Sequence, residues 1–426
     1  MKNKRSMRLV AALGALALVA AACGDGAADG GDFEPGPLGA VEIGPGEPVE
    51  IRSLAAISGE VAFLGIPSEN ATRMAVEDYG DLLGHQINLG QGLDDLCSAD
   101  GGQAAAQTIV SDEQVVGVIG TSCSGAAQAA APLISDAGMV MISPANTSPS
   151  LTSDLEGNAG DNNYPGYFRT AHNDLFQGQA AANFVYNELG LTQVALIHDG
   201  DPYTNGLTNA FQGAFEELGG EIVVHTAVSV GQTDLVPVLT EVAAGEPELI
   251  FFPIFPDPGI ALVQQVRGVS GLEDVVLMAA DGLSVTNFMN EPETEGMYFS
   301  GPDTRLAGNT NGVTGVSGQE FLDRYQTEFG EPPSADFWGH SYDATIMLLQ
   351  AIENVAVQDG DTLFIDRQAL RDELYATSGF EGLIGTLACD EFGDCGSQQV
   401  VVFEHTNLDD HQASKANIVY EFDGEI

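Results

Sequence analysis

Residues 118–128 have the sequence VIGTSCSGAAQ, in which an apolar run gives way to hydroxyl side chains and a cysteine. The apolar run predicts a strand over Val115–Ile119, and the alanine-rich segment that follows predicts a helix over Ser124–Ala137. In open α/β sheets, ligands bind where strands end and helices begin. A nucleophile, a phosphate cradle and a small-ligand site would all suit this junction.

The alternation of strand and helix continues along most of the chain. It predicts parallel sheets flanked by helices, and two separate series of strands predict two such sheets. The expected strands are Val49–Ile57, Ile87–Leu93, Val115–Ile119 and Val140–Ile142, then Gln193–His198, Ile222–Val228, Glu248–Ile254 and Val275–Ala279. The expected helices are Glu69–Tyr79, Ser124–Ala137, Thr204–Leu218, Leu235–Ala244 and Gly259–Val269. Residues 319–376 are expected to be helical, with Phe337–Val355 the longest helix.

The charge of the chain excludes some partners. There are 62 acidic and 13 basic residues, a formal net charge of −49. Nucleic-acid binding depends on Lys and Arg that neutralise phosphates, so it is excluded, and anionic membranes would repel this surface. Two explanations of the acidity stay open. One is a solubility device for salty surroundings, where screening limits self-repulsion, and the other is a lineage bias in composition.

The first 22 residues have the pattern of an export signal. Their apolar run, Leu9–Ala22, is shorter than the roughly 20 residues that cross a bilayer. The small residues before Cys23 resemble a bacterial lipoprotein signal, although Ala20 stands where that pattern prefers leucine. We predict a signal peptide over 1–22 and an extracytoplasmic protein, anchored only by lipid on Cys23 to the outer face of the cell membrane. Residues 23–47, rich in Gly, Pro and acids, predict a flexible tether.

The cysteine count supports this location. Lipidation of Cys23 leaves four of the five cysteines, an even number that suits disulfides in an exported protein. Three pairings are possible. The simplest joins the nearest neighbours in sequence, Cys97–Cys123 and Cys389–Cys395.

The sequence lacks the patterns of common enzymes and metal sites. Residues 120–124 lack the second glycine of G-x-S-x-G, and a disulfide would consume Cys123 as a nucleophile. The seven histidines show no zinc spacing. Residues 199–206, DGDPYTNG, fail the calcium pattern at Tyr203, and the acidic stretch 389–395, CDEFGDC, fits a disulfide-clipped turn better than a calcium loop. We expect no enzyme activity, no cofactor and no metal.

Three expected strand ends carry polar groups that suit a small ligand. Ser124 opens a helix, where its hydroxyl and the free N–H groups can receive an anion. Ala145 and Thr147 follow the next strand, and the acid Asp281 ends a third. Each residue also has an ordinary role: Ser124 as a helix cap, Thr147 and Asp281 as turn residues.

Together these stretches resemble the type I periplasmic solute-binding proteins of ABC importers, specifically the leucine/isoleucine/valine-binding family. The resemblance runs from about Val49 to the C-terminus. It rests on SGEVAFLG (58–65), DDLCSADGGQAAA (94–106), residues 120–152, YFRT (167–170), VALIHDGDPYTNGL (194–207) and EGMYFSGP (295–302). It implies a disulfide between the segments that hold Cys97 and Cys123. It also implies an α/β fold of two doubly wound parallel-sheet lobes joined by three crossovers. Lobe one would comprise 48–170 and 300–396, and lobe two 171–299 and 397–426.

The resemblance also implies an amino-acid ligand. Its carboxylate would be held at Ser124 and Thr147, and its ammonium at the carbonyl near Ala145 and at Asp281, which is one methylene shorter than the usual glutamate. The family places contacts to the ligand at Tyr203, Phe255 and Leu64, the last standing where an aromatic residue is common. Phe337 and Trp338 would line the mouth of the site.

We therefore predict a monomeric binding lipoprotein that captures an amino acid, branched-chain or similar, between two closing lobes. Its partners would be the permease and ATPase subunits of an ABC importer. A binding protein for urea or a short amide stays open, as does a ligand-sensing domain for a receptor or regulator, because one fold serves several functions. An enzyme acting on a bound amide would need a nucleophile and base that the sequence does not supply.

Overall fold

The computed structural model describes residues 33–424 of the 426-residue chain. Residues 35–426 form one compact unit. The predicted signal peptide over 1–22, the lipidation of Cys23 and the first part of the predicted tether lie outside the described residues. Over residues 33–424, none of the helices combines the length and the apolar character needed to cross a membrane.

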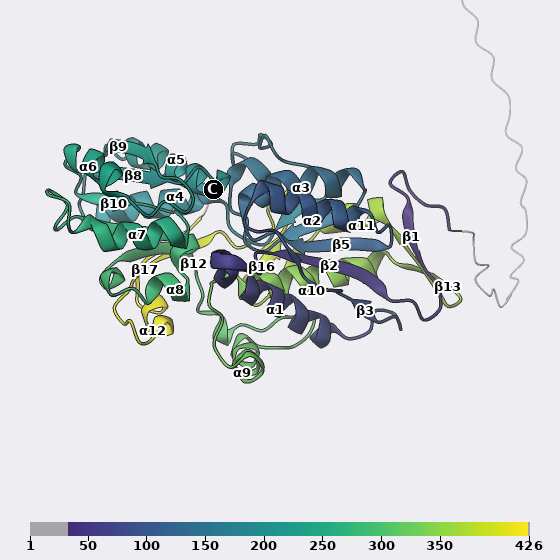
Figure 1. Ribbon diagram of the computed structural model, residues 1–426. Coiled ribbons are helices and arrows are strands. Elements are labelled where there is room, and N and C mark those ends of the chain that lie inside the picture. The colour runs from purple at the N-terminus through teal and green to yellow at the C-terminus, as the bar shows by residue number, and fades with distance from the viewer. Residues whose placement is uncertain (1–32, 425–426) are drawn as a thin grey trace, which may run out of the picture. The chain divides into compact units, whose positions relative to one another are not determined.

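Two β-sheets organise the compact unit (Figure 1). The first has the strand order β3-β2-β5-β6-β7, all parallel, with β4 also paired to β2. The second has the order β18-β17-β12-β11-β10-β8-β9, in which β17 runs antiparallel to both of its neighbours, β12 and β18. The bounds in the first sheet are β2 (Val49–Ala55), β3 (Ile87–Asn88), β4 (Leu93–Asp94), β5 (Val115–Gly120), β6 (Val140–Ser143) and β7 (Tyr167–Arg169). Those in the second are β8 (Gln193–His198), β9 (Glu221–Ala227), β10 (Leu249–Phe251), β11 (Val276–Ala280), β12 (Tyr298–Pro302), β17 (Gln399–Glu404) and β18 (Ile418–Asp423).

Helices cover both faces of each sheet, as in a doubly wound fold. The first sheet packs against α1 and α10 on one face and against α2 and α3 on the other. The second packs against α6, α7 and α8 on one face and α4 and α5 on the other. All residues of β5 are buried, which explains its continuous apolar sequence. The helices are α1 (Ala62–Tyr79), α2 (Ala99–Val110), α3 (Ser124–Asp136), α4 (Asp174–Asn183), α5 (Pro202–Glu217), α6 (Val236–Ala244), α7 (Pro256–Val266), α8 (Thr286–Met289), α9 (Gly318–Phe329), α10 (Trp338–Val355), α11 (Arg367–Tyr375) and α12 (His411–Lys415).

The chain crosses between the sheets three times. It leaves the first sheet after β7, leaves the second after β12, and returns to the second between β16 (Gly385–Ala388) and β17. We call the two halves lobe one and lobe two, after the sheet that each contains. Residues 300–302 belong to β12 in lobe two, so the second crossover begins at residue 303, slightly later than predicted.

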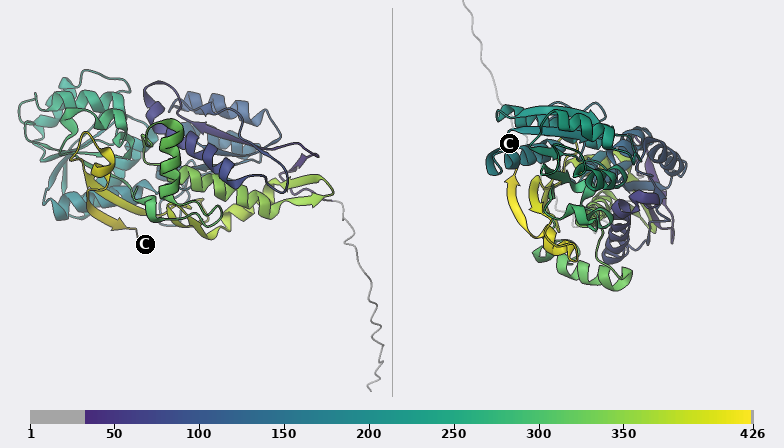
Figure 2. Two further views of the ribbon diagram at one scale, coloured as in Figure 1. Left: turned by 90° about the horizontal axis from the view of Figure 1, so that it is seen from below. Right: turned by 60° about the vertical axis from the view of Figure 1, so that its left-hand side comes forward.

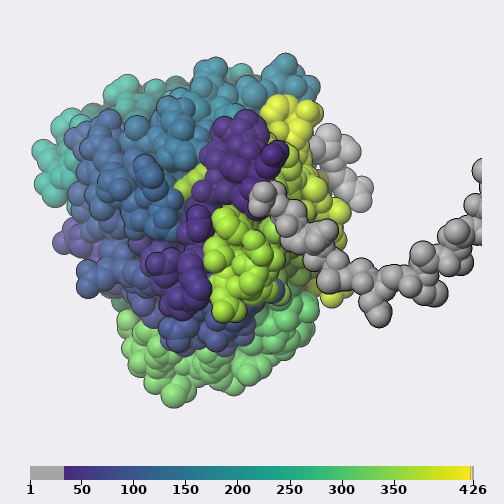
Figure 3. All heavy atoms as spheres, turned by 90° about the vertical axis from the view of Figure 1, so that its right-hand side faces the viewer, coloured from purple at the N-terminus to yellow at the C-terminus, as the bar shows by residue number. Residues whose placement is uncertain are grey.

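The prediction of a tether over 23–47 is wrong for its last part. β1 (Ala40–Ile43) pairs antiparallel with β14 (Thr362–Asp366), which also pairs with β13 (Val357–Asp359). Val41 and Ile43 are 2% and 1% exposed and belong to the core of lobe one. Figure 3 shows this N-terminal segment, in purple, beside the light green 357–366 hairpin. The surrounding Gly, Pro and acidic residues hid a four-residue strand whose partner lies far away in the sequence.

The prediction of a wholly helical 319–376 is also incomplete. α9, α10 and α11 are helices, but β13 and β14 interrupt them. Thr362–Asp366 alternates buried and half-buried side chains with the two-residue period of a strand, and it pairs with both β1 and β13. A further hairpin, β15 (Ser378–Gly382) with β16, precedes the third crossover. In place of the expected strand Ile87–Leu93 there are two short strands, β3 and β4. The helix expected to begin at Glu69 is α1, which begins seven residues earlier.

Candidate functional site

A cavity lies between the two lobes, at the carboxyl ends of β5 and β11. It encloses about 370 Å³, including the part that opens to solvent. Lobe one contributes α1, the start of α3, the loop after β6 and the start of α10, and lobe two contributes the rest. The lining residues are Leu64, Ser122, Cys123, Ser124, Ala145, Tyr203, Phe255, Asp281, Gly282 and Phe337.

Six of the seven predicted ligand-contacting residues line this cavity, and Thr147 is not among the lining residues. Thr147 is 1% exposed and lies in the same loop as Ala145. Its carbonyl accepts a hydrogen bond of 2.9 Å from the N–H of Asp174, the first residue of α4. The predicted mouth residue Trp338 also differs, since it stacks on Phe321 in the core of lobe one with ring centroids 4.8 Å apart.

The wall contributed by α3 is suited to an anion. Ser124 is the first residue of α3, where backbone N–H groups point out of the helix and carry partial positive charge. Ser124 Oγ accepts a hydrogen bond of 3.3 Å from the Ser148 N–H. Because this bond uses a lone pair of the oxygen, the hydroxyl hydrogen stays free to be donated into the cavity.

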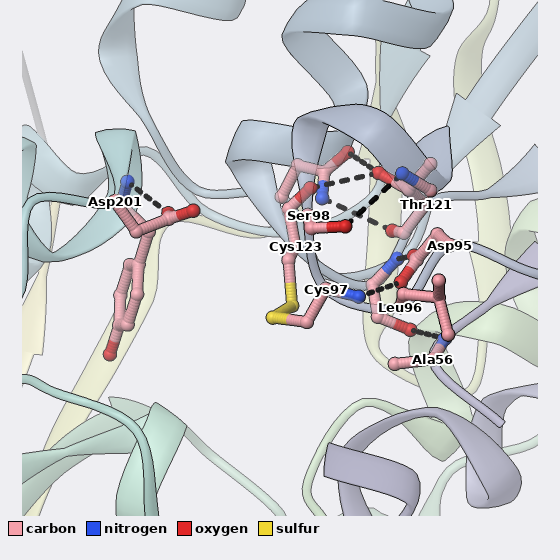
Figure 4. The surroundings of a disulfide bond; sticks show 12 residues. Ala56, Asp95, Leu96, Cys97, Ser98, Thr121, Cys123 and Asp201 are labelled. Atoms are coloured by element: carbon pink, nitrogen blue, oxygen red, sulfur yellow. Dashed lines mark hydrogen bonds between the residues drawn. A yellow bond between two sulfur atoms is a disulfide. The ribbon is translucent and has the colours of Figure 1, made fainter. Parts of the chain in front are cut away.

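The Cys97–Cys123 disulfide fixes the start of α3 (Figure 4). It joins the residue before Ser124 to the loop that follows β4. In that loop the Asp95 carboxylate accepts hydrogen bonds of 2.7 Å from the N–H groups of Cys97 and of Ser122. Burial raises the pKa of Asp95 to about 6, and these backbone bonds oppose the rise. The disulfide and the buried acid therefore hold Ser122, Cys123 and Ser124 in one arrangement.

The opposite wall carries a single acid, Asp281, directly after β11. Asp281 Oδ1 accepts hydrogen bonds from Gln177 Nε2 at 2.7 Å and from the Tyr203 hydroxyl at 3.2 Å. The Tyr203 oxygen accepts one of 3.1 Å from the Gly282 N–H, so its orientation is set. Both of these side-chain bonds end on Oδ1, so Oδ2 is the oxygen that could accept a hydrogen bond from a cation. Burial raises the pKa of Asp281 to about 7, mainly because the charged form loses hydration.

Apolar side chains close the rest of the cavity. Leu64 comes from α1, Phe255 precedes α7 and Phe337 precedes α10. Tyr203 and Phe255 lie with ring centroids 5.7 Å apart. These groups surround the polar pair with surface that suits an aliphatic or aromatic group.

Arg169, which the sequence analysis left without a role, shapes the loop after β6. This residue ends β7, is fully buried, and forms an ion pair with Asp394. Its Nη1 donates to the carbonyls of Asn146 at 3.2 Å and Ser148 at 2.9 Å. Asp394 lies in the loop closed by the Cys389–Cys395 disulfide, so the clipped turn predicted from CDEFGDC supplies the partner. A lone arginine in the apolar stretch YFRT was the only signal in the sequence.

Two more acids lie near the cavity. Asp174, the first residue of α4, is fully buried, and neither of its carboxylate oxygens has a hydrogen-bond partner within the described residues. Burial, and then the nearby Asp281, raise its pKa well above the usual value. Asp201 caps α5 and faces α3 across the cleft, where a Cβ on Gly125 would lie 2.4 Å from its Oδ2. Burial raises the pKa of Asp201 to about 7.

No cluster of three His, Cys, Asp or Glu side chains arranged to hold a metal ion occurs in the part of the chain that the structure describes. The arrangement offers an anion site on lobe one, an anionic acceptor on lobe two and apolar surface between them.

Comparisons with known proteins find a family, related sequences and solved structures that this chain resembles. A family model described as "Periplasmic binding protein" matches residues 48–407. Leu/Ile/Val-binding protein homolog 3 of Brucella melitensis is 26% identical over 362 residues, which cover 84% of this chain and 91% of the relative. A solved leucine-binding protein of Thermotoga maritima is 25% identical with a TM-score of 0.73, over 88% of this chain and 99% of that chain.

A second solved structure shares the fold. It is the isoleucine complex of a branched-chain amino acid transporter substrate-binding protein from Streptococcus pneumoniae. That protein is 22% identical with a TM-score of 0.69, over 88% of this chain and 98% of that chain.

The buried ion pair gives a testable expectation. Asp394→Asn would leave the Arg169 charge buried without its anion, which typically costs about 3–5 kcal/mol. We expect a loss of that size in the free energy of unfolding, measured by urea denaturation. Glu391→Gln, which removes an exposed carboxylate from the same loop, is the control and should change it by less than about 0.5 kcal/mol. A loss below about 1 kcal/mol in Asp394→Asn would contradict the importance given to this pair.

Proposed function

Because the chain belongs to the periplasmic binding protein family, we propose that it captures a free amino acid between its lobes for an importer of the ABC class. Its relatives are solute-binding proteins and not enzymes, and the same holds for this chain. Family membership also implies a location outside the cytoplasm. Delivery to permease and ATPase subunits is part of the proposal, as is a monomeric state.

The observation that carries the proposal is the pairing of opposite polar groups across one small cavity. Ser124 and the N–H groups of α3 suit a carboxylate, and the carboxylate of Asp281 suits an ammonium. The carbonyl of Ala145 supplies a second acceptor for the ammonium. The carboxylate would thus be bound by lobe one and the ammonium by groups of both lobes, so that binding favours closure. Because Thr147 is not among the lining residues, the carboxylate role implied for it passes to the α3 N–H groups.

The apolar wall points to the class of side chain. Leu64, Phe255 and Phe337 offer no charged or hydrogen-bonding group. We infer an aliphatic amino acid, since a charged side chain would lose its hydration against these residues without finding a partner.

One observation favours a second candidate, a neutral amide such as urea. The raised pKa of Asp281 means that its carboxyl holds a proton more readily than an exposed acid does. A protonated Asp281 both donates and accepts hydrogen bonds, which would suit an amide.

The attachment to the membrane is a separate part of the proposal. The sequence before Cys23 resembles a lipoprotein signal, and two acyl chains would meet the requirement for stable anchoring. We expect the N-terminal peptide of protein from its native host to begin at a diacylated Cys23, as measured by mass spectrometry. An unmodified cysteine, or cleavage at another bond, would refute the anchor and leave the ligand proposal untouched.

A thermal-shift screen of the twenty amino acids, small amides and simple carboxylates tests the ligand class. We expect aliphatic amino acids to raise the melting temperature most, because ligand that binds only the folded state stabilises it. Carboxylates without an ammonium group should give little shift. Stabilisation by urea-like amides alone would favour the second candidate.

Asp281→Asn should then weaken the best amino acid by about 30-fold or more. Removing one partner of a desolvated charge pair typically costs about 2–5 kcal/mol, and each 1.4 kcal/mol is about tenfold in affinity. Calorimetry measures the change. Asp274→Asn is the matched control, because this exposed acid precedes the other end of β11 and should leave affinity within about twofold. Binding by Asp281→Asn within twofold of the parent chain would exclude the ammonium assignment.

The pH dependence of binding distinguishes the two candidates. With its pKa at about 7, Asp281 loses its charge as the pH falls from about 8 to about 6, while a free amino acid stays zwitterionic. Amino-acid affinity should therefore fall about fivefold to tenfold over this range in the parent chain and stay level in Asp281→Asn. Calorimetry at both pH values checks this. Affinity that rises as the pH falls would instead indicate a protonated Asp281 that binds a neutral amide.

A further inference from the structure

Lys415 is an unusual residue in this chain. The sequence contains only three lysines, Lys2, Lys4 and Lys415, against 62 acidic residues. Lysines are rarely buried in proteins unless they are paired, yet Lys415, the one lysine within residues 33–424, is 5% exposed. A lysine that is buried in this way does not serve to keep the protein surface soluble. A buried ammonium needs polar or anionic partners that offset its lost hydration.

The partners of Lys415 lie on both sides of the cleft. Its Nζ forms an ion pair with Asp336, which is 3% exposed, and donates a hydrogen bond of 3.0 Å to the Ser284 carbonyl. Lys415 ends α12, and Ser284 follows the cavity residue Gly282, so both belong to lobe two. Asp336 lies between α9 and α10 of lobe one. Figure 2 shows the C-terminal strands and α12, in yellow, with the teal and green elements of lobe two.

Asp336 belongs to a short segment of lobe one that is docked on lobe two, which we call the arm (residues 334–337). The Ser334 carbonyl accepts a hydrogen bond of 3.1 Å from the Thr286 N–H of lobe two. Ala335 is 4% exposed and packs in the hydrophobic core of lobe two. The last residue of the arm, Phe337, lines the ligand cavity. Each residue of the arm thus contacts lobe two or the site.

We propose that Lys415 is a positioning residue whose ion pair with Asp336 latches the arm onto lobe two and so holds Phe337 over the closed cavity. When the lobes close, the Lys415 ammonium and the Asp336 carboxylate lose their hydration and pair with each other. On opening, both regain water, so the pair exists only when the lobes are together. The pair also ties the arm to the 281–284 turn that carries Asp281, because Lys415 bonds to the Ser284 carbonyl.

The latch goes beyond the proposed function. It rests on that function in one respect, which is that closure of the lobes retains a ligand. It predicts a specific kinetic effect. Breaking the pair should leave the encounter with the ligand unchanged and speed its escape, because the arm acts after the ligand has entered. Lys415→Met leaves Asp336 buried and unpaired in the closed form, which penalises closure. Lys415→Met with Asp336→Asn removes both charges and so removes most of that penalty.

The first experiment uses Lys415 as a native probe. The full-length chain is treated with an amine-reactive ester, and acetylation of the Lys415 peptide is followed by mass spectrometry. L-Leucine is the added amino acid, or, if L-leucine gives no thermal shift, the amino acid that gives the largest. We expect it to slow the modification of Lys415 at least fivefold. We also expect Asp336→Asn, without any added amino acid, to speed the modification at least fivefold over the parent chain.

The second experiment measures binding of the same amino acid by calorimetry and stopped-flow kinetics. Lys415→Met should weaken affinity at least tenfold, almost all of it through faster dissociation, and the double variant should recover at least half of that loss on a logarithmic scale. Arg73→Met is the control, since Arg73 pairs with Glu69 within α1 at 43% side-chain exposure. It should bind within twofold of the parent chain. Circular dichroism checks that each variant folds, and if Lys415→Met does not, the double variant and Asp336→Asn carry the comparison.

The outcomes separate the latch from the proposed function. If no amino acid shifts the melting temperature, the proposed function fails, while the effect of Asp336→Asn on Lys415 modification still tests the latch. Equal modification rates in the parent chain and Asp336→Asn would overturn the latch whatever the ligand is. So would a Lys415→Met chain that binds within twofold of the parent, or one that loses affinity through slower association.

Discussion

A buried positive charge at the crossover between the lobes is the constraint on which the binding site depends. Arg169 has no access to water, so its guanidinium must be neutralised and hydrogen-bonded inside the protein. Asp394 supplies the charge, the carbonyls of Asn146 and Ser148 accept hydrogen bonds from Nη1, and Thr152 Oγ1 accepts one from Nη2. The backbone of Arg169 also bonds to Gly393 and Cys395, which brings the first and third crossovers side by side. One side chain thereby sets both the hinge and a wall of the cavity.

Around this centre, the cleft collects acids that have few cations near them. Burial raises the pKa of both Asp174 and Asp281, and a neighbouring acid adds to each rise, Asp281 for Asp174 and Asp336 for Asp281. An ammonium would relieve this repulsion when the acids are ionised, which supports the ligand class that we propose. On the opposite wall the start of α3 carries partial positive charge, and the disulfide between Cys97 and Cys123 keeps it in place. The closed cavity is therefore polar at both ends, although most of its surface is apolar.

The predictions that failed share a physical cause. β1 is stable only because β14 offers it an edge more than three hundred residues later, and nothing in the local sequence of residues 40–43 distinguishes it from the tether around it. β14 in turn lies in a stretch whose composition favours helices. In each case a tertiary contact outweighed the local preference of the chain.

What the sequence determined by itself was local and periodic. The alternation of apolar runs and amphipathic segments determined most strands and helices of the two sheets, and the strand ends carrying Ser124 and Asp281 indicated where polar ligand groups would be found. The resemblance to a known family added the order of the lobes and the partners around the ligand. Only the tertiary structure decided which buried charges meet, as in Arg169 with Asp394 and Lys415 with Asp336. The reason is that a charge can be buried only beside its partner, and the fold brings these partners together from opposite ends of the chain or of the cleft.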